Sequence, residues 1–151
     1  MKRYLLIGLM LLLAPLAMAK GNNGLISIKS AHSVSVTLDR LESLLTKKGI
    51  TIVTRWRHDA AAKKVGIALR PTELLIFGNP KLGSRFFTSQ QTAGIDLPMK
   101  ALAWKDKNGQ VWLTYNDPQY IADRHGIKNR AATVRKMTAA LKYLMNAAAR
   151  P

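Results

Sequence analysis

The spacing of apolar and polar residues predicts short strands that alternate with amphipathic helices. Residues 25–30 alternate between the two classes, as expected of a strand with one buried face. From Val34 to Leu45 the apolar residues recur every three or four positions instead, which predicts an amphipathic helix. Ser33 can cap the start of this helix, and Gly49 favours its end.

A further strand and a short helix are expected next. Residues 50–58 are rich in β-branched side chains and alternate in polarity, which predicts a strand. Regular alternation would place five side chains on one face of it, namely Ile50, Ile52, Thr54, Trp56 and His58. The run from Asp59 to Lys64 is rich in alanine and lysine, which predicts one or two helical turns capped by Asp59.

The strand expected over residues 72–78 contains four consecutive large apolar side chains. Such a run predicts burial on both faces of a sheet. Polar residues stand at both ends, with Arg70 and Glu73 at the start and Asn79 after the last strand residue. A buried strand holds such residues at fixed positions relative to the core, so both ends are candidate positions for a site.

A hairpin is the clearest prediction for the second half of the chain. Two alternating runs, 99–106 and 110–116, are joined through Asn108 and Gly109. An Asn-Gly pair between alternating runs is a strong signal for a tight turn between antiparallel strands. Before the hairpin, residues 80–91 predict a short helix that begins with a proline and turns two phenylalanines inward.

Helices are expected again at the carboxyl end. Asp117 followed by a proline favours the start of a helix that ends at Gly126. Residues 129–149 place an apolar stripe on one face and basic residues on the other. Five strands with two long helices predict an α+β fold, in which helices cover one face of an antiparallel sheet.

The first nineteen residues have the pattern of an export signal. Two basic residues precede a short apolar run, and the sequence Ala-Met-Ala at 17–19 offers a cleavage site. The alternative is an uncleaved anchor, but the run is short for a membrane-spanning helix. We therefore expect a cleaved signal peptide over 1–19, a flexible leader over 20–24 and a single domain over 25–149, exported to the periplasm or secreted.

Composition narrows the classes of function. The chain carries a net charge of +16 and no cysteine, which excludes thiol catalysis and cysteine-zinc sites. The basic excess is consistent with peripheral contact between the last helix and an anionic membrane or an acidic envelope partner. It is equally consistent with a surface that is simply solvated. Nucleic acid is not an expected partner, because the aromatic residues fall on strands where burial is the default and because export is expected.

Candidate chemistry is sparse. The three histidines form no metal-binding motif, and no serine elbow, Walker loop or dinucleotide turn occurs, so no metal or other cofactor is expected. Carboxylates beside strands or proline turns also have structural interpretations. Asp117 can cap a helix, Asp96 can accept backbone hydrogen bonds, and Glu73 can pair with Arg70 or Lys100.

Several ordered blocks of the chain resemble the domain of unknown function 302 family. The blocks are residues 37–42, 70–80, 96–100 with Trp104, and 111–118 followed by Tyr120, Arg124 and His125. The resemblance spans roughly residues 26–144. The resemblance implies a small α+β fold with a curved antiparallel sheet of about five strands, grouped with the TATA-binding-protein-like folds and often paired as a homodimer. It does not imply DNA binding, because a fold does not determine a function.

The resemblance also implies a set of recurrent polar positions. Carried onto this chain they are Arg70, Glu73, Asn79, Asp96, Lys100, Asn116, Asp117, Tyr120, Arg124 and His125. Many of them stand at strand ends, where a rigid scaffold places ligand-binding groups, so we expect a shallow polar pocket there. Lys100 and Arg70 would favour an anionic ligand in that pocket.

Three functions remain open. The first is an exported, non-enzymatic binding or interaction domain for a small anionic ligand or an envelope partner. The second is a small enzyme in which Asp96 or Asp117 forms an acid–base pair with His125. The third is an adaptor that docks its basic last helix on an acidic partner or on anionic lipid. The binding domain leads, because no motif favours catalysis.

Overall fold

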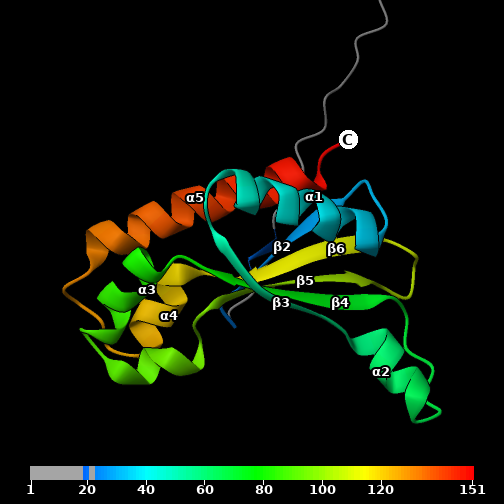
Figure 1. Ribbon diagram of the computed structural model, residues 1–151, viewed down its shortest axis with the longest axis horizontal. Coiled ribbons are helices and arrows are strands. Elements are labelled where there is room, and N and C mark those ends of the chain that lie inside the picture. The colour runs from blue at the N-terminus through cyan, green and yellow to red at the C-terminus, as the bar shows by residue number, and fades with distance from the viewer. Residues whose placement is uncertain (1–18, 21–22) are drawn as a thin grey trace, which may run out of the picture.

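The computed structural model describes residues 19–20 and 23–151 and shows a single antiparallel sheet with long helices on one face (Figure 1). The strand order across the sheet is β1-β2-β6-β5-β4-β3. The strands are β1 (Ala19–Lys20), β2 (Leu25–Ser30), β3 (Thr51–Arg57), β4 (Thr72–Gly78), β5 (Met99–Lys105) and β6 (Val111–Asn116). This arrangement confirms the α+β prediction. The expected signal peptide lies outside the described residues except for Ala19.

The helices divide between the face of the sheet and its two ends. They are α1 (Val34–Lys47), α2 (His58–Lys64), α3 (Pro80–Phe87), α4 (Pro118–Arg124) and α5 (Ala131–Ala149), with a 3-10 helix over Gln91–Ile95. In Figure 1, α1 and α5 lie over the sheet, α3 and α4 gather at one end, and α2 projects from the other. No helix in the described part of the chain is long and apolar enough to cross a membrane.

The core lies between the sheet and the two long helices. Helix α1 begins as predicted, with the Ser33 hydroxyl accepting a hydrogen bond from the Val36 backbone N–H. Its stripe of Leu38, Leu41 and Leu45 is fully buried. Burial of each such side chain stabilises the fold by roughly 1.5–3 kcal/mol. The leucines at the predicted helical spacing therefore hold α1 on the sheet.

The prediction that β4 is buried on both faces is wrong. Leu75 and Phe77 are buried beneath the helices, whereas Leu74 and Ile76 on the opposite face are only half-buried. The reason is that α1 and α5 cover the same face of the sheet (Figure 1). The face away from them is half-buried through contacts between neighbouring strands.

The predicted alternation along β3 is also wrong, because the strand is irregular. Its register against β4 shifts between Ile52 and Thr54, so that Val53 is an extra residue. A bulge of this kind reverses the faces of the residues that follow it. Ile52 therefore packs toward the core, while Trp56 lies on the opposite face and is 54% exposed.

Helix α2 also differs from the prediction at its start. It begins at His58, with Arg57 in the capping position and no side-chain cap hydrogen bond. Asp59 therefore stands in the first turn and does not cap the helix. Its carboxylate pairs instead with the Arg57 guanidinium, 3.0 Å away.

The hairpin of β5 and β6 is confirmed, and Asp106 organises its turn. The Asp106 carboxylate accepts hydrogen bonds from the backbone N–H groups of Asn108 and Gln110 and from the Trp112 indole, each at 2.9 Å. Gly109 adopts a φ of +83°, a conformation that favours glycine. The Trp112 hydrogen bond is the largest influence that lowers the pKa of Asp106, and the backbone hydrogen bonds lower it further.

Acid should remove the stabilisation that this carboxylate gives. Because the pKa of Asp106 is lowered in the folded state, its contribution is complete above the unfolded value of about 3.9 and is lost as pH falls through the folded pKa. We therefore expect the difference in urea midpoint between the wild type and Trp112→Phe to shrink between neutral pH and about pH 3. A difference that stays constant over this range would show that Trp112 acts through packing alone.

Candidate functional site

An apolar pocket of about 290 Å³ lies where the end of β4 meets α3 and α5. Its walls include Phe77 of β4, Phe87 of α3, Met99 of β5 and Leu144 of α5. Among the lining side chains only those of Thr51, Asn79 and Ser84 are polar. An apolar lining with few polar groups is typical of sites that bind the hydrocarbon part of a small molecule.

The pocket is open to solvent on the side of β3, α3 and α5. Six of its lining residues are exposed, namely Thr51, Val53, Pro80, Ser84, Pro98 and Ala140. The chain between Leu97 and Met99, which also lines the pocket, passes close to Gly78, where an added Cβ would lie 3.2 Å from the Pro98 Cβ. A glycine at this position allows the two segments to approach each other closely.

Asn79 has a structural task at the edge of this pocket. Its side-chain oxygen accepts a hydrogen bond of 3.0 Å from the Lys81 backbone N–H and so caps α3. Pro80 occupies the first position of the helix, as the sequence predicted. The cap orients α3 so that Leu82 and Phe87 reach the pocket.

Four of the predicted site residues meet at the same end of the sheet, around Asp96. The Asp96 carboxylate contacts His125 Nε2 at 2.7 Å and Arg124 Nη1 at 3.3 Å. Lys100 Nζ donates a hydrogen bond of 3.1 Å to the Asp96 backbone carbonyl. The Thr92 hydroxyl lies 3.0 Å from His125 Nδ1, and sequence reasoning missed this residue.

This cluster is largely satisfied by its own members. The side chains of Asp96 and His125 are 14% and 7% exposed, and each oxygen of the carboxylate has a basic partner. The Arg124 side chain is 54% exposed. An anion that approached Arg124 would have to compete with Asp96, so the cluster ties α4 to the chain before β5 more readily than it binds an anion.

Arg70 lies far from this cluster, which corrects the expectation that it and Lys100 would flank one pocket. The Arg70 Nε donates a hydrogen bond of 3.0 Å to the Lys105 backbone carbonyl at the end of β5. Lys100 lies near the start of the same strand. Five residues of strand separate the two positions by about 17 Å, because a strand rises by about 3.3 Å per residue.

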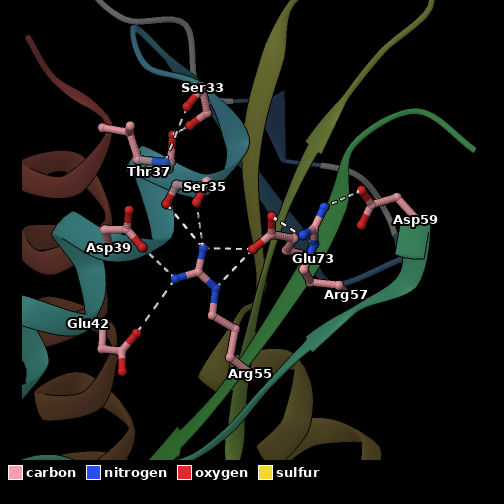
Figure 2. A network of polar contacts seen from close by, with 10 residues as sticks. Ser33, Ser35, Thr37, Asp39, Glu42, Arg55, Arg57, Asp59 and Glu73 are labelled. Carbon is pink, nitrogen blue, oxygen red and sulfur yellow. Dashed lines mark hydrogen bonds and ion pairs between the residues drawn. The ribbon is translucent and has the colours of Figure 1, made fainter. Parts of the chain in front are cut away.

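Glu73 belongs to an ion-pair network beneath α1, shown in Figure 2. Its Oε2 accepts hydrogen bonds from Arg55 Nε at 2.9 Å and Nη2 at 2.6 Å, while Oε1 lies 3.6 Å from Arg57 Nε. Arg55 also pairs with Asp39 of α1, and Arg57 pairs with Asp59 of α2. The network joins α1 and α2 to strands β3 and β4.

The expected pairing of Glu73 with Arg70 or Lys100 is therefore wrong. Lys100 stands opposite Ile76 in the register of β4 and β5, which places it on the half-buried face of the sheet. Glu73 lies on the other face, beneath the helices. Its register partner in β3 is Arg57. Strand alternation could have excluded Lys100, but Arg55 could be found only with the bulge of β3 known.

Asn116, Asp117 and Tyr120 form the junction of β2, β6 and α4. Asp117 caps α4 by accepting a hydrogen bond of 2.9 Å from the Gln119 backbone N–H. The Tyr120 ring lies over Gly24, where an added Cβ would lie 2.1 Å from a ring atom. Asn116 ends β6 and is half-buried. The contacts of Asp117 and Tyr120 give these two residues structural roles, and none of the three residues lines the pocket.

Within the described ranges, no three side chains of histidine, aspartate or glutamate lie close enough together to hold a metal ion. The arrangement at this end of the sheet is thus an apolar pocket beside a self-paired polar cluster. Residues 96–100 serve both, because Leu97 to Met99 line the pocket while Asp96 and Lys100 hold the cluster.

Part of the chain is similar to larger proteins of Brucella. It is 45% identical over 106 residues to "Fluoride-specific ion channel FluC 1" of Brucella suis biovar 1 (strain 1330), which is 70% of this chain and 42% of that protein. The same identity holds for "Fluoride-specific ion channel FluC 2" of Brucella melitensis biotype 1, with 39% of that protein covered. This chain therefore spans about two fifths of the length of these relatives.

A solved structure shares the fold. The crystal structure of an uncharacterized conserved DUF302 protein from Bacillus stearothermophilus matches with a TM-score of 0.75 at 16% sequence identity. The match covers 83% of this chain and 98% of that one. Residues 26–144 also match the family described as domain of unknown function DUF302. The chain therefore belongs to the DUF302 family.

Proposed function

We propose that this protein is a non-enzymatic binding domain whose pocket holds the apolar part of a small molecule. The observation that carries the proposal is the pocket of about 290 Å³, whose lining is almost entirely apolar and part of whose rim is exposed. Apolar surface in contact with water is unfavourable by roughly 25 cal/mol per Å², so an occupant that displaces water from it gains free energy. The volume suits a small ligand.

The charge of the protein favours a ligand with an anionic end. The chain carries a net charge of +16, and Lys81 and Arg85 are exposed on α3, between residues that line the pocket. Asn79 and Ser84 add polar groups to the lining. We therefore propose an amphipathic anion, such as a medium-chain carboxylate, with its hydrocarbon chain inside the pocket and its charge toward α3.

An envelope setting is part of this proposal. It is supported by the export-like pattern of the first nineteen residues and by the basic net charge. The relatives named as fluoride-specific ion channels add support, because proteins of that name contain a stretch 45% identical to this chain. We propose that the domain works at or near a membrane, outside the cytoplasm.

The test uses decanoate as the probe and two tryptophan variants of α5. Ala140 lines the pocket, whereas its neighbour Ala139 is equally an exposed alanine but is not part of the lining. We expect Ala140→Trp to weaken decanoate binding at least about tenfold in calorimetry, while Ala139→Trp leaves it unchanged. Decanol in place of decanoate reports the contribution of the charge. Equal binding by the two variants, or no binding of either compound, would contradict the proposal.

An acid–base enzyme is the second candidate, and the Asp96–His125 contact of 2.7 Å favours it. The Thr92 hydroxyl contacts the other ring nitrogen of His125. The hydroxyl, the imidazole and the Asp96 carboxylate therefore lie in series, an arrangement that occurs in nucleophilic catalysis. Asp117 is a poor partner for His125, because α4 separates them by about 12 Å along its axis. If His125→Gln abolished hydrolysis of activated esters without lowering stability, and Thr92→Ala did the same, catalysis would replace binding.

A further inference from the structure

Exposed apolar side chains concentrate in one part of this protein. Half of the large apolar residues that are exposed in the described chain lie between Val53 and Leu69. Three of them follow α2, where Val65, Ile67 and Leu69 are 72%, 60% and 45% exposed. Residues 58–71, called here the α2 arm, project beyond the sheet in Figure 1, away from α1 and α5.

The α2 arm is loosely attached to the rest of the fold. None of the residues of α2, all of which the structure describes, is buried. From Lys63 to Pro71 every residue is exposed. The apolar side chains of the α2 arm therefore stabilise no core, and their exposure to water is unfavourable unless another surface covers them.

The α2 arm is also basic. Lys63 and Lys64 stand immediately before the exposed apolar residues, and Arg70 follows them. The Asp59 carboxylate of the α2 arm lies 3.0 Å from the Arg57 guanidinium, which balances its negative charge. Arg70 donates a hydrogen bond to the Lys105 backbone carbonyl, whereas Lys63 and Lys64 are exposed.

Apolar side chains flanked by lysines match the surface of an anionic bilayer better than that of a protein. The central part of a protein interface is depleted in lysine and enriched in aromatic residues. The boundary between lipid headgroups and acyl chains accepts exposed aliphatic side chains to a depth of about 5–10 Å, with basic residues at the phosphates.

We propose that the α2 arm docks this protein on anionic lipid. Val65, Ile67 and Leu69 enter the boundary between the headgroups and the acyl chains, and Lys63 and Lys64 contact the phosphates. The pocket stays accessible, because it lies at the end of β4 whereas the α2 arm precedes the start of that strand. This docking does not depend on which ligand the pocket takes, and it assigns the membrane contact to the α2 arm instead of α5.

A local probe of insertion is possible because the chain contains no cysteine. Val65→Cys and Ile95→Cys place a single thiol at two sites that are each 72% exposed, one in the α2 arm and one at the far end of the sheet. Each variant is purified in the form that results from processing in the producing cell and is labelled with an environment-sensitive fluorophore. It is then mixed with phosphatidylcholine vesicles that contain about 30% phosphatidylglycerol. We expect a blue shift and protection from an aqueous quencher at position 65 and neither at 95.

Matched charge variants locate the docking surface. Lys63→Gln with Lys64→Gln should weaken binding to these vesicles about 25-fold, at about fivefold for each lysine. Arg135→Gln with Lys136→Gln removes the same charge from α5 and should weaken it much less. An equal or larger effect of the α5 pair would overturn the proposal, as would an unchanged probe at position 65. A probe that shifts with protein concentration without vesicles would assign the α2 arm to a second copy of the chain instead.

Discussion

Glu73→Ala should lower the free energy of unfolding by about 3 kcal/mol, measured by urea denaturation. The Glu73 side chain is 6% exposed and is bound twice by Arg55, whose own side chain is 23% exposed. Without the carboxylate, the Arg55 guanidinium would remain between α1 and the sheet with part of its charge unpaired. Removing one partner of a buried pair is expensive for this reason, even where the intact pair adds little to stability.

Asp39→Ala provides the matched control, because Asp39 is another carboxylate that pairs with Arg55. Its side chain is 58% exposed, so water can replace it, and we expect a loss below about 1 kcal/mol. The double variant of Arg55→Met and Glu73→Ala should recover part of the stability lost in Glu73→Ala alone, since the charges left without Arg55 are those of exposed carboxylates that water can solvate. Equal losses for Glu73→Ala and Asp39→Ala would show that burial does not control the strength of this network.

Phe86→Ala should cost about 4 kcal/mol of stability, whereas Phe87→Ala should cost much less and change the pocket. The two residues are adjacent on α3, but Phe86 is fully buried in the core while Phe87 is half-buried and lines the pocket. Successive helical residues are rotated by about 100°, which lets one helix serve the core and the pocket with neighbouring side chains.

The measurement pairs urea denaturation with decanoate binding. For Phe87→Ala we expect the pocket to widen and to favour a longer carboxylate over decanoate, with a modest loss of stability. Phe86→Ala should keep its preference for decanoate in whatever fraction remains folded. A Phe87→Ala variant as unstable as Phe86→Ala would show that the pocket wall is part of the core, and the proposed binding site would lose its basis.

Most of the secondary structure could be predicted because each element depends on residues close together in the chain. The stripe of α1, its Ser33 cap, the Asn108-Gly109 turn and the capped start of α4 are all confirmed. In each case the decisive interactions join residues within a few positions of one another, such as the Ser33 hydroxyl and the Val36 backbone N–H.

The errors share a physical cause. The two-sided burial expected for β4 failed because the apolar run could not show that the long helices cover one face only. The pairing of Glu73 failed because the bulge in β3 decides which arginines face it. Both outcomes depend on contacts between segments that are distant in the chain, and local periodicity contains no information about those contacts.

The candidate site shows the same division. Asp96, Lys100, Arg124 and His125 were expected near one another, and they do meet, whereas Arg70 lies at the other end of β5. The expected pocket was polar, and of the predicted site residues only Asn79 lines the apolar pocket that the structure contains. Its walls come from segments between Ile50 and Leu144, and its apolar residues look the same in the sequence as residues of the core.

Local sequence was enough to set the helices, the hairpin, the α+β class and the membership of the DUF302 family, because these follow from short-range spacing and ordered blocks of residues. Tertiary packing alone decided which face of the sheet is covered, which charges pair with Glu73, and that an apolar pocket stays open beside α3. These features arise from the closeness of residues far apart in the chain, which exists only once the sheet and helices have packed together.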